Sequence, residues 1–236
     1  ATVSSTILVS SAGSWSTSVT VPEGASGVNH IIDAYGALTS ATNVTDLNFT
    51  VTPLISISPS TGAVGTTITM TAKGFYSNES GISITYDGIV VASGISASSL
   101  GSWSGTFVVP ASGVGAHIVG ASGASTPATS VPAVNFTITP KITVSPLSGP
   151  TGTTVTVTGS GFAVNEGGII ITLAGNVVKS GVSADSNGSW NTTFSVPIGP
   201  GGSYTVNAYG VNTAATLVPG VTFSVTAHIT VSLASA

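Results

Sequence analysis

The feature that most constrains the fold of this chain is an internal repeat of 87 residues. Each of its three tryptophans closes a Gly-Ser-Trp triplet, at Trp15, Trp103 and Trp190, so that the spacings are 88 and 87 residues. Three phenylalanines recur at spacings of 87 residues: Phe49, Phe136 and Phe223. Self-similarity at a fixed period predicts an array of similar structural units.

The repeat predicts the domain organisation. Complete repeats are expected at 54–140 and 141–227, whereas residues 1–53 match only the later strands of a repeat. Residues 228–236 match only its first strand. The repeat therefore predicts two full units, with a partial unit before them and a single strand after them.

Hydrophobic residues alternate with polar ones, which is the pattern of a strand with one buried face. The pattern covers Trp190–Val196 and, in the same way, Trp15–Val21, and it also places Val155 and Val157 on one side of a strand. Each segment is therefore predicted to be a strand, with the tryptophan facing a core.

Tight hairpins are expected at two dipeptides. Asp87-Gly88 lies between two β-branched runs, and Ala174-Gly175 occupies the same place in the next repeat. Glycine tolerates the positive φ that such turns need. With about seven short strands per repeat, we predict an all-β chain of tandem immunoglobulin-like sandwiches, arranged as beads on a thread.

Charge is scarce, and this excludes one class of function. Only 4% of residues are charged, with three Lys, no Arg and a net charge of −4. Nucleic-acid binding needs clustered cations, so it is not expected. There is no cysteine to form a disulfide, and because no apolar run reaches 18 residues, no membrane span is predicted.

The start of each full repeat carries a recognisable motif. It runs Ile142-Thr-Val-Ser-Pro146, then Gly149, Gly152-Thr-Thr-Val155 and Gly161-Phe162, and the repeat before it begins Ile55-Ser-Ile-Ser-Pro59 and reaches Gly74-Phe75. This motif resembles the opening of IPT/TIG-type immunoglobulin-like repeats of prokaryotic surface proteins. The resemblance implies extracellular stalks or adhesins. The DNA-binding branch of such domains depends on basic loops, which this chain lacks.

No catalytic, cofactor-binding or metal-binding residue is predicted, and no cofactor. His30 and His117 align with Tyr204, and a ligand role would not tolerate that exchange. Glu79 and Glu166 recur singly, 87 residues apart, and we interpret both as loop carboxylates. A calcium site needs six or more oxygen ligands, usually including several carboxylates. We therefore expect that the chain is not an enzyme.

Six Asn-x-Ser/Thr sequons make N-linked glycans an expected partner of this chain. They begin at Asn43, Asn48, Asn78, Asn135, Asn187 and Asn191. Asn48 and Asn135 each precede a phenylalanine of the repeat, so an inward phenylalanine would point the asparagine outward. Glycans would also keep an uncharged surface in solution.

Residues 1–53 match only part of a repeat, which raises the question of what covers the core face of this first unit. Ala1 aligns with Ile89, so the strands that precede this position in a full repeat are not represented in 1–53. Either these strands belong to a longer repeat protein, or subunits polymerise by donor-strand complementation. The candidate inter-subunit strand is Ile229, Thr230, Val231, Ser232 and Leu233. It supplies one strand where about three are needed.

The sequence thus predicts a structural role at the cell surface. We expect a subunit or segment of a pilus-like extracellular filament or stalk, used in surface attachment or cell–cell contact. Its expected partners are copies of itself or adjoining repeats of a longer chain, and another cell surface. The alternative is a carbohydrate- or ligand-binding adhesin module.

Overall fold

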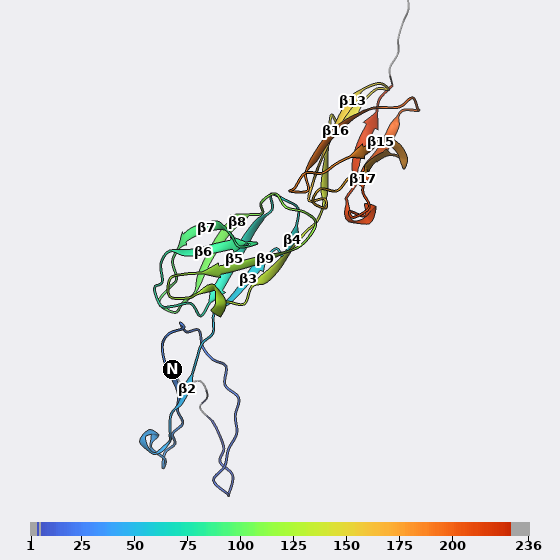
Figure 1. Cartoon of the computed structure of the whole chain (residues 1–236). Coiled ribbons are helices and arrows are strands. Elements are labelled where there is room, and N and C mark those ends of the chain that lie inside the picture. The colour runs from blue at the N-terminus through green and yellow to red at the C-terminus, as the bar shows by residue number, and fades with distance from the viewer. Residues whose placement is uncertain (1–3, 5, 228–236) are drawn as a thin grey trace, which may run out of the picture. The chain divides into compact units, whose positions relative to one another are not determined.

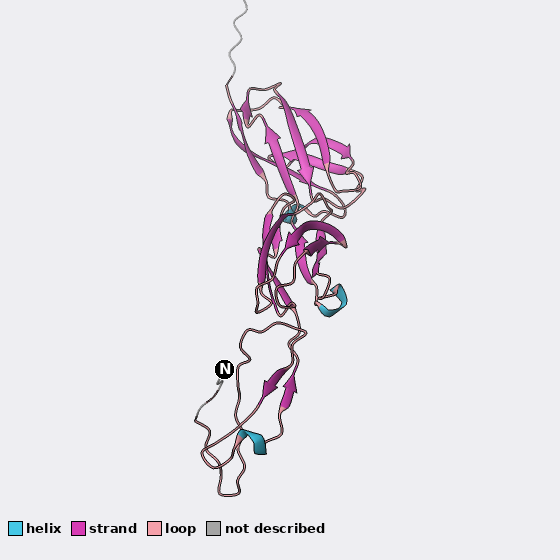
Figure 2. Ribbon diagram, turned by 90° about the vertical axis from the view of Figure 1, so that its left-hand side faces the viewer, coloured by secondary structure: helices cyan, strands magenta, loops and turns pink. Residues whose placement is uncertain are grey.

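The computed structural model describes residues 4 and 6–227. Over these residues the fold is all-β, as predicted, and its helical content consists of single three-residue turns of 3₁₀-helix (Figure 2). These are η1 (Ala41–Asn43), η2 (Ala128–Ser130) and η3 (Ala215–Leu217). The described chain divides into two compact units, each described by itself below.

The first unit comprises Ala1–Ser56, Met70–Gly105 and Gly120–Val134, and the second comprises Ile57–Thr69, Thr106–Val119 and Asn135–Ala236. All five boundaries between the two units fall within residues 54–140. The domain boundaries inferred from the repeat therefore stay predictions.

Short strands follow one another along the chain (Figure 1). The first ten are β1 (His30–Ile32), β2 (Leu47–Phe49), β3 (Leu54–Ser58), β4 (Thr61–Gly62), β5 (Thr67–Lys73), β6 (Ile82–Tyr86), β7 (Ile89–Ile95), β8 (Trp103–Val108), β9 (Gly115–Ser122) and β10 (Val134–Ile138). The others are β11 (Lys141–Ser145), β12 (Ser148–Gly149), β13 (Thr154–Ser160), β14 (Ile169–Leu173), β15 (Asn176–Val182), β16 (Trp190–Ser195), β17 (Gly202–Tyr209) and β18 (Val221–Val225).

The last eight strands form two sheets. One has the order β11-β13-β16 and the other β12-β18-β17-β14-β15. Neighbours are antiparallel except for β12 and β18, which run parallel. The count of eight exceeds the predicted seven because β12 is a separate strand of two residues.

Residues 54–140 contribute strands in the same order, β3-β5-β8 and β4-β10-β9-β6-β7. The two predicted hairpins join β6 to β7 and β14 to β15. In each hairpin both turn residues have positive φ: 49° and 80° at Asp87 and Gly88, and 52° and 81° at Ala174 and Gly175. Glycine and aspartate adopt this left-handed region at little cost, so the local sequence sets the turn at Asp87-Gly88, whereas Ala174 takes the same conformation without that preference.

The core of the second unit lies between the two sheets. Alternate residues of each strand point inward, so Val155 and Val157 of β13 are fully buried, as predicted. Phe162 and Phe223 are fully buried with them. Burying one such side chain stabilises a fold by about 1.5–3 kcal/mol.

Trp190 closes one side of this core and meets Phe162 edge-on, with ring centroids 5.1 Å apart. It pairs with Gly159 on the neighbouring strand, where an added Cβ would lie within 3.0 Å of the indole ring. In the first unit Trp103 meets Phe75 in the same way, at 5.2 Å. Both tryptophans are 6% exposed, so they are core residues, as expected.

Residues 1–53 form much less regular structure than the sequence indicated. Among the described residues of this segment, β1 and β2 form the one strand pair, with His30 opposite Phe49. The strand predicted over Trp15–Val21 is wrong, because these residues carry no strand. The equivalent strand β16 pairs with β13, and 1–53 contains no segment equivalent to β13, so the backbone of 15–21 has no ladder to join.

Candidate interaction surface

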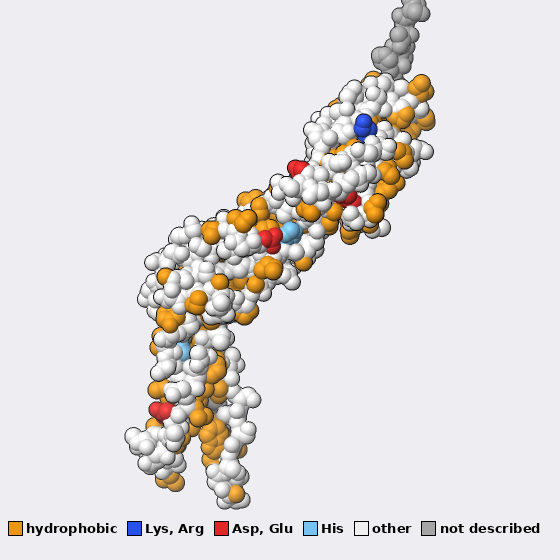
Figure 3. Space-filling view, viewed as in Figure 1, with side chains coloured by type: hydrophobic (Ala, Val, Ile, Leu, Met, Phe, Trp, Pro, Cys, Tyr) orange, Lys and Arg blue, Asp and Glu red, His pale blue; other side chains and the backbone are white. Residues whose placement is uncertain are grey.

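Hydrophobic side chains stay exposed in residues 1–53. Leu8 is 92% exposed, Leu47 66%, Ile31 59% and Trp15 47%. In the space-filling view, orange side chains gather on this part of the chain, and charged groups are few on the face shown (Figure 3). Monomeric soluble proteins rarely expose large contiguous apolar patches unless they serve as interaction sites.

Two positions of residues 1–53, Trp15 and Val21, are buried in their aligned copies further along the chain, whereas Ile118, which aligns with Ile31, is also exposed. Val21 is 43% exposed, whereas its aligned residues Val109 and Val196 are 1% and 2% exposed. Trp15 is 47% exposed against 6% for both other tryptophans. Residues 1–53 therefore present the side chains of a sandwich core without the layer that covers them elsewhere.

A hollow of about 310 Å³ lies along this apolar side of residues 1–53. It is lined by Val19, Thr20, Val21, Pro22, Glu23, Asn29, His30, Ile31, Ile32, Asp33 and Phe49. The lining combines the segment that forms no strand with the β1–β2 pair. Apolar side chains such as Val19 and Val21 share this lining with polar ones such as Glu23 and Asp33.

Glu79 and Glu166 lie in loops, as predicted, but their carboxylates are buried, which sequence reasoning missed. Glu166 is 2% exposed. The backbone amides of Asn212 and Thr213 donate to its Oε1 at 2.6 and 3.0 Å, and the Thr213 hydroxyl donates to its Oε2 at 2.6 Å. The Thr213 hydroxyl oxygen also accepts from the amide of Ala163 at 2.9 Å.

Glu79 is held in the same way. Its Oε1 accepts from the amides of Ser125 and Thr126 at 2.6 and 2.9 Å, and its Oε2 accepts from the Thr126 hydroxyl at 2.5 Å. Burial acts to raise the pKa of Glu79, but these hydrogen bonds outweigh it and hold the pKa below its ordinary value of 4.5. Both glutamates therefore tie loops together.

The ring position that changes from His to Tyr has a structural use. His30 Nε2 donates to the carbonyl of Ala25 at 2.9 Å, and His117 Nε2 donates to that of Gly113 at 2.8 Å. The Tyr204 hydroxyl likewise donates to Pro200 at 2.9 Å. A ring donor of either type closes the loop before the strand, which is why the exchange is tolerated.

Among the described residues, no group of three His, Cys, Asp or Glu side chains could hold a metal ion. That same part of the chain contains no helix long and apolar enough to cross a membrane.

All six sequon asparagines are exposed. Asn48 lies on β2 and Asn135 on β10, each beside a more buried phenylalanine, as expected from the alternation. Asn191 lies on β16, within the strand predicted over Trp190–Val196. Asn43, Asn78 and Asn187 lie in a 3₁₀ turn or in loops.

The candidate inter-subunit strand, Ile229–Leu233, lies outside the described residues. Its pairing stays a prediction.

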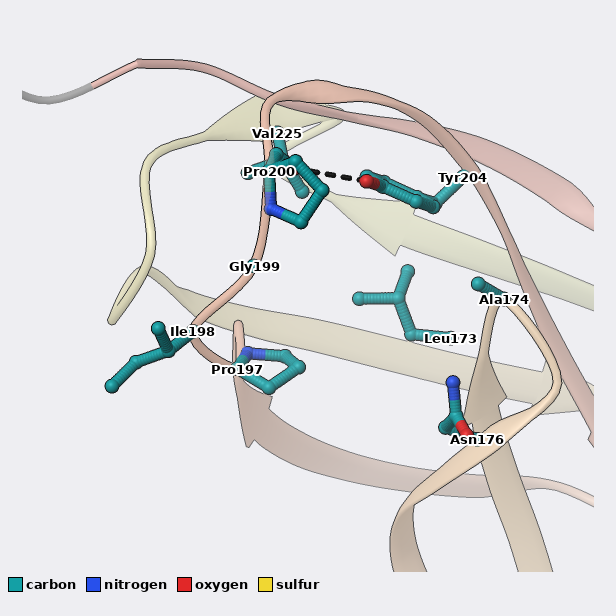
Figure 4. Close-up of a pocket in the computed structure, with 9 residues that line it drawn as sticks. All are labelled: Leu173, Ala174, Asn176, Pro197, Ile198, Gly199, Pro200, Tyr204 and Val225. Atoms are coloured by element: carbon teal, nitrogen blue, oxygen red, sulfur yellow. Dashed lines mark hydrogen bonds between the residues drawn. The ribbon is translucent and has the colours of Figure 1, made fainter.

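A shallow apolar pocket of about 190 Å³ lies near the end of the second unit (Figure 4). It is formed by the loop Pro197–Pro200, the hairpin turn between β14 and β15, and Tyr204. The Tyr204 hydroxyl is turned toward Pro200, while Ile198, 95% exposed, points away from the other labelled side chains. Tyr204 supplies the aromatic ring of this lining.

The comparison with family models matches residues 140–225 to the IPT/TIG domain. This stretch is similar to an IPT/TIG domain. The match covers the part of the chain that carries the Ile142–Phe162 motif. The resemblance inferred from that motif is thereby confirmed.

Solved structures that match this chain include the following three. The central fibronectin-III array of RIM-binding protein is 8% identical, with 74% of this chain and 61% of that chain covered and a TM-score of 0.29. The fibronectin(III)-like modules of Clostridium thermocellum CbhA are 17% identical, with 72% and 92% covered and a TM-score of 0.26. Invasin, a bacterial integrin-binding protein, is 18% identical, with 78% and 43% covered and a TM-score of 0.26.

No curated protein matches this chain. The chain spans less than two thirds of the RIM-binding protein array and of the invasin chain.

Proposed function

We propose that this chain is a structural subunit or segment of an extracellular, glycosylated filament or stalk that mediates surface attachment or cell–cell contact. In this proposal the chain is a tandem array of IPT/TIG-type sandwiches with a period of 87 residues. The uncovered core face of residues 1–53 is the observation that carries the proposal. Trp15 and Val21 are exposed there, whereas their aligned residues are buried in the rest of the chain.

Strand complementation would cover this face. Strands from another copy, or from an adjoining repeat of a longer chain, would pair with residues 15–21 and pack on the apolar side chains of β1 and β2. Such β-augmentation gives affinity through main-chain hydrogen bonds. Because the donor and acceptor surfaces differ, the contact is head-to-tail and builds an open thread when it does not close into a ring.

N-linked glycans fit this role. The six sequon asparagines are exposed, so each can carry a glycan without disturbing the core. Six glycans would supply the hydrated surface that a chain with only 4% charged residues otherwise lacks.

A carbohydrate- or ligand-binding adhesin module is the second candidate. The pocket beside Tyr204 favours it, since the half-buried aromatic ring could stack on a sugar (Figure 4). Small-molecule sites combine apolar and aromatic walls with a few polar groups.

Sedimentation of the purified chain and its retention on a glycan array separate the two candidates. The filament proposal predicts concentration-dependent assembly and no selective retention. A chain that stays monomeric at high concentration and binds one class of glycan would reject the filament and establish the binding module. Tyr204→Ala should then abolish that retention, whereas Tyr209→Ala, away from the pocket, should not.

A further inference from the structure

One type of turn occurs at three places in the described chain. In each, the amide of a glycine donates to the carbonyl oxygen of a threonine three residues later, at 2.8–2.9 Å: Gly36 to Thr39, Gly123 to Thr126, and Gly210 to Thr213. A 3₁₀ turn follows directly: η1, η2 and η3. The backbone of the turn at 36–39 is thus formed in the same way as in the other two.

Two of these turns enclose a glutamate carboxylate. Thr126 and Thr213 are 1% and 0% exposed, and each donates its hydroxyl hydrogen to the buried glutamate. A Cβ added at Gly123 or Gly210 would lie within 3.0 Å of that carboxylate. The absence of a side chain on this glycine therefore leaves the space that the glutamate carboxylate occupies.

The third turn has the same donors and no acid. Among the described residues, no carboxylate accepts a hydrogen bond from Thr39, which is exposed. Leu38 is 100% exposed. A Cβ added at Gly36 would meet nothing within 4 Å, so the space that the carboxylate fills elsewhere is open here.

We propose that the turn Gly36–Thr39 is a binding site for a glutamate carboxylate carried by the segment that completes the unit of residues 1–53. The Leu38 and Thr39 amides would donate to one carboxylate oxygen and the Thr39 hydroxyl to the other. Hydrogen bonds to an ionised acceptor are about twice as strong as neutral ones. This inference rests on the proposed function, since it names a chemical requirement of the completing partner.

The geometry of the two filled sites defines that partner more closely. The residue before each glutamate, Asn78 or Asn165, has a positive φ of 55° or 54°. Asparagine accepts this conformation more readily than most residues. The partner is therefore a loop with an Asn-Glu pair, as found within residues 54–88 and 141–175. Residues 228–236 contain no acidic side chain, so this strand alone would leave the site empty.

A synthetic peptide of residues 54–88 tests the site when it is titrated into the full chain. It is compared with the same peptide carrying Glu79→Gln, and both are also titrated into the chain variants Thr39→Val and Thr42→Val. The readouts are affinity and the hydrogen-exchange rates of the Leu38 and Thr39 amides. Thr42 is an exposed threonine of η1 and serves as the matched control.

The proposal predicts that the Glu79 peptide binds about tenfold more tightly than the Gln peptide. Thr39→Val should remove most of this difference, Thr42→Val should not, and the Leu38 and Thr39 amides should be protected only by the Glu79 peptide. Equal affinity of both peptides, without selective protection, would overturn the carboxylate site and leave strand complementation standing. Failure of both peptides to bind would instead reject completion by such strands.

A fusion protein, in which the peptide segment is part of the same chain, tests the site without depending on the solubility of a free peptide. Residues 54–88 are joined ahead of the chain through a Gly/Ser linker, with Glu79 or Gln at the corresponding position of the added segment. The glutamate form should unfold at higher urea concentration than the glutamine form, and the difference should vanish with Thr39→Val. Equal midpoints would contradict the carboxylate site.

Discussion

The Thr213 hydroxyl donates to the buried Glu166 carboxylate at 2.6 Å, across 47 residues of chain. Thr126 and Glu79 make the same bond at the same separation, at 2.5 Å. The loop after β17 is thereby tied to the loop before β14. In a fold with so few charges, these two buried carboxylates hold loops together by hydrogen bonds.

Glu166→Gln should destabilise the second unit by about 2–3 kcal/mol. The amide would offer N–H groups to at least one donor and leave it buried without an acceptor. Urea unfolding measures the loss. Glu23→Gln changes an exposed glutamate and should stay within about 0.5 kcal/mol. A loss at Glu166 no larger than this control would show that the bonds contribute nothing.

Acid should weaken the site of Glu79. Its pKa is held below 4.5 in the folded chain, so the unfolded chain binds the proton more readily. The stabilisation is complete above the unfolded pKa and is lost as the pH falls through the lower folded pKa. Urea midpoints measured from pH 7 to pH 2 should therefore fall less steeply below pH 4.5 in Glu79→Gln. Parallel curves for the two proteins would contradict the account.

Trp190→Ala should cost about 3–5 kcal/mol, because it empties a core position beside Phe162. Trp15→Ala in the same chain should cost less than about 1 kcal/mol, since the Trp15 ring is 47% exposed. Thermal unfolding of the chain compares the two variants. The proposal also predicts that Trp15→Ala weakens assembly of the filament, because another strand would cover Trp15 there. Unchanged assembly would contradict this prediction.

Gly188→Ala tests a close approach in the turn before β16. Gly188 has a φ of 71°, and an added Cβ would lie within 3.0 Å of the Phe162 carbonyl oxygen. Gly13 has a φ of 77° but an added Cβ there meets nothing within 4 Å. Gly13→Ala should therefore cost about 1 kcal/mol, from the left-handed backbone alone, and Gly188→Ala clearly more. Similar costs would show that the Phe162 contact relaxes freely.

Local patterns predicted local structure well. Asp87-Gly88 is enough to specify a tight turn, and the alternation around Val155 is enough to specify which face is buried. The strand over Trp15–Val21 failed because a strand also needs a neighbour to pair with, and alternation says nothing about that neighbour.

The Glu166 site depended on contacts that no local pattern shows. The acid and its threonine are 47 residues apart, so an isolated loop glutamate looked solvated. One signal could have found the pair: Glu79 with Thr126 and Glu166 with Thr213 recur at one spacing. A carboxylate and a hydroxyl that repeat together suggest a contact, whereas either alone does not.

Electron microscopy of the native material, with the mass of the intact polypeptide measured beside it, tests the central claim most directly. The account predicts threads with a bead repeat of about 40 Å, since a ten-residue strand spans about 33 Å. A polypeptide near 22.9 kDa plus glycan would establish subunits joined by strand exchange, and a much larger one would establish a single long repeat chain. Isolated short rods that never join end to end would contradict the filament.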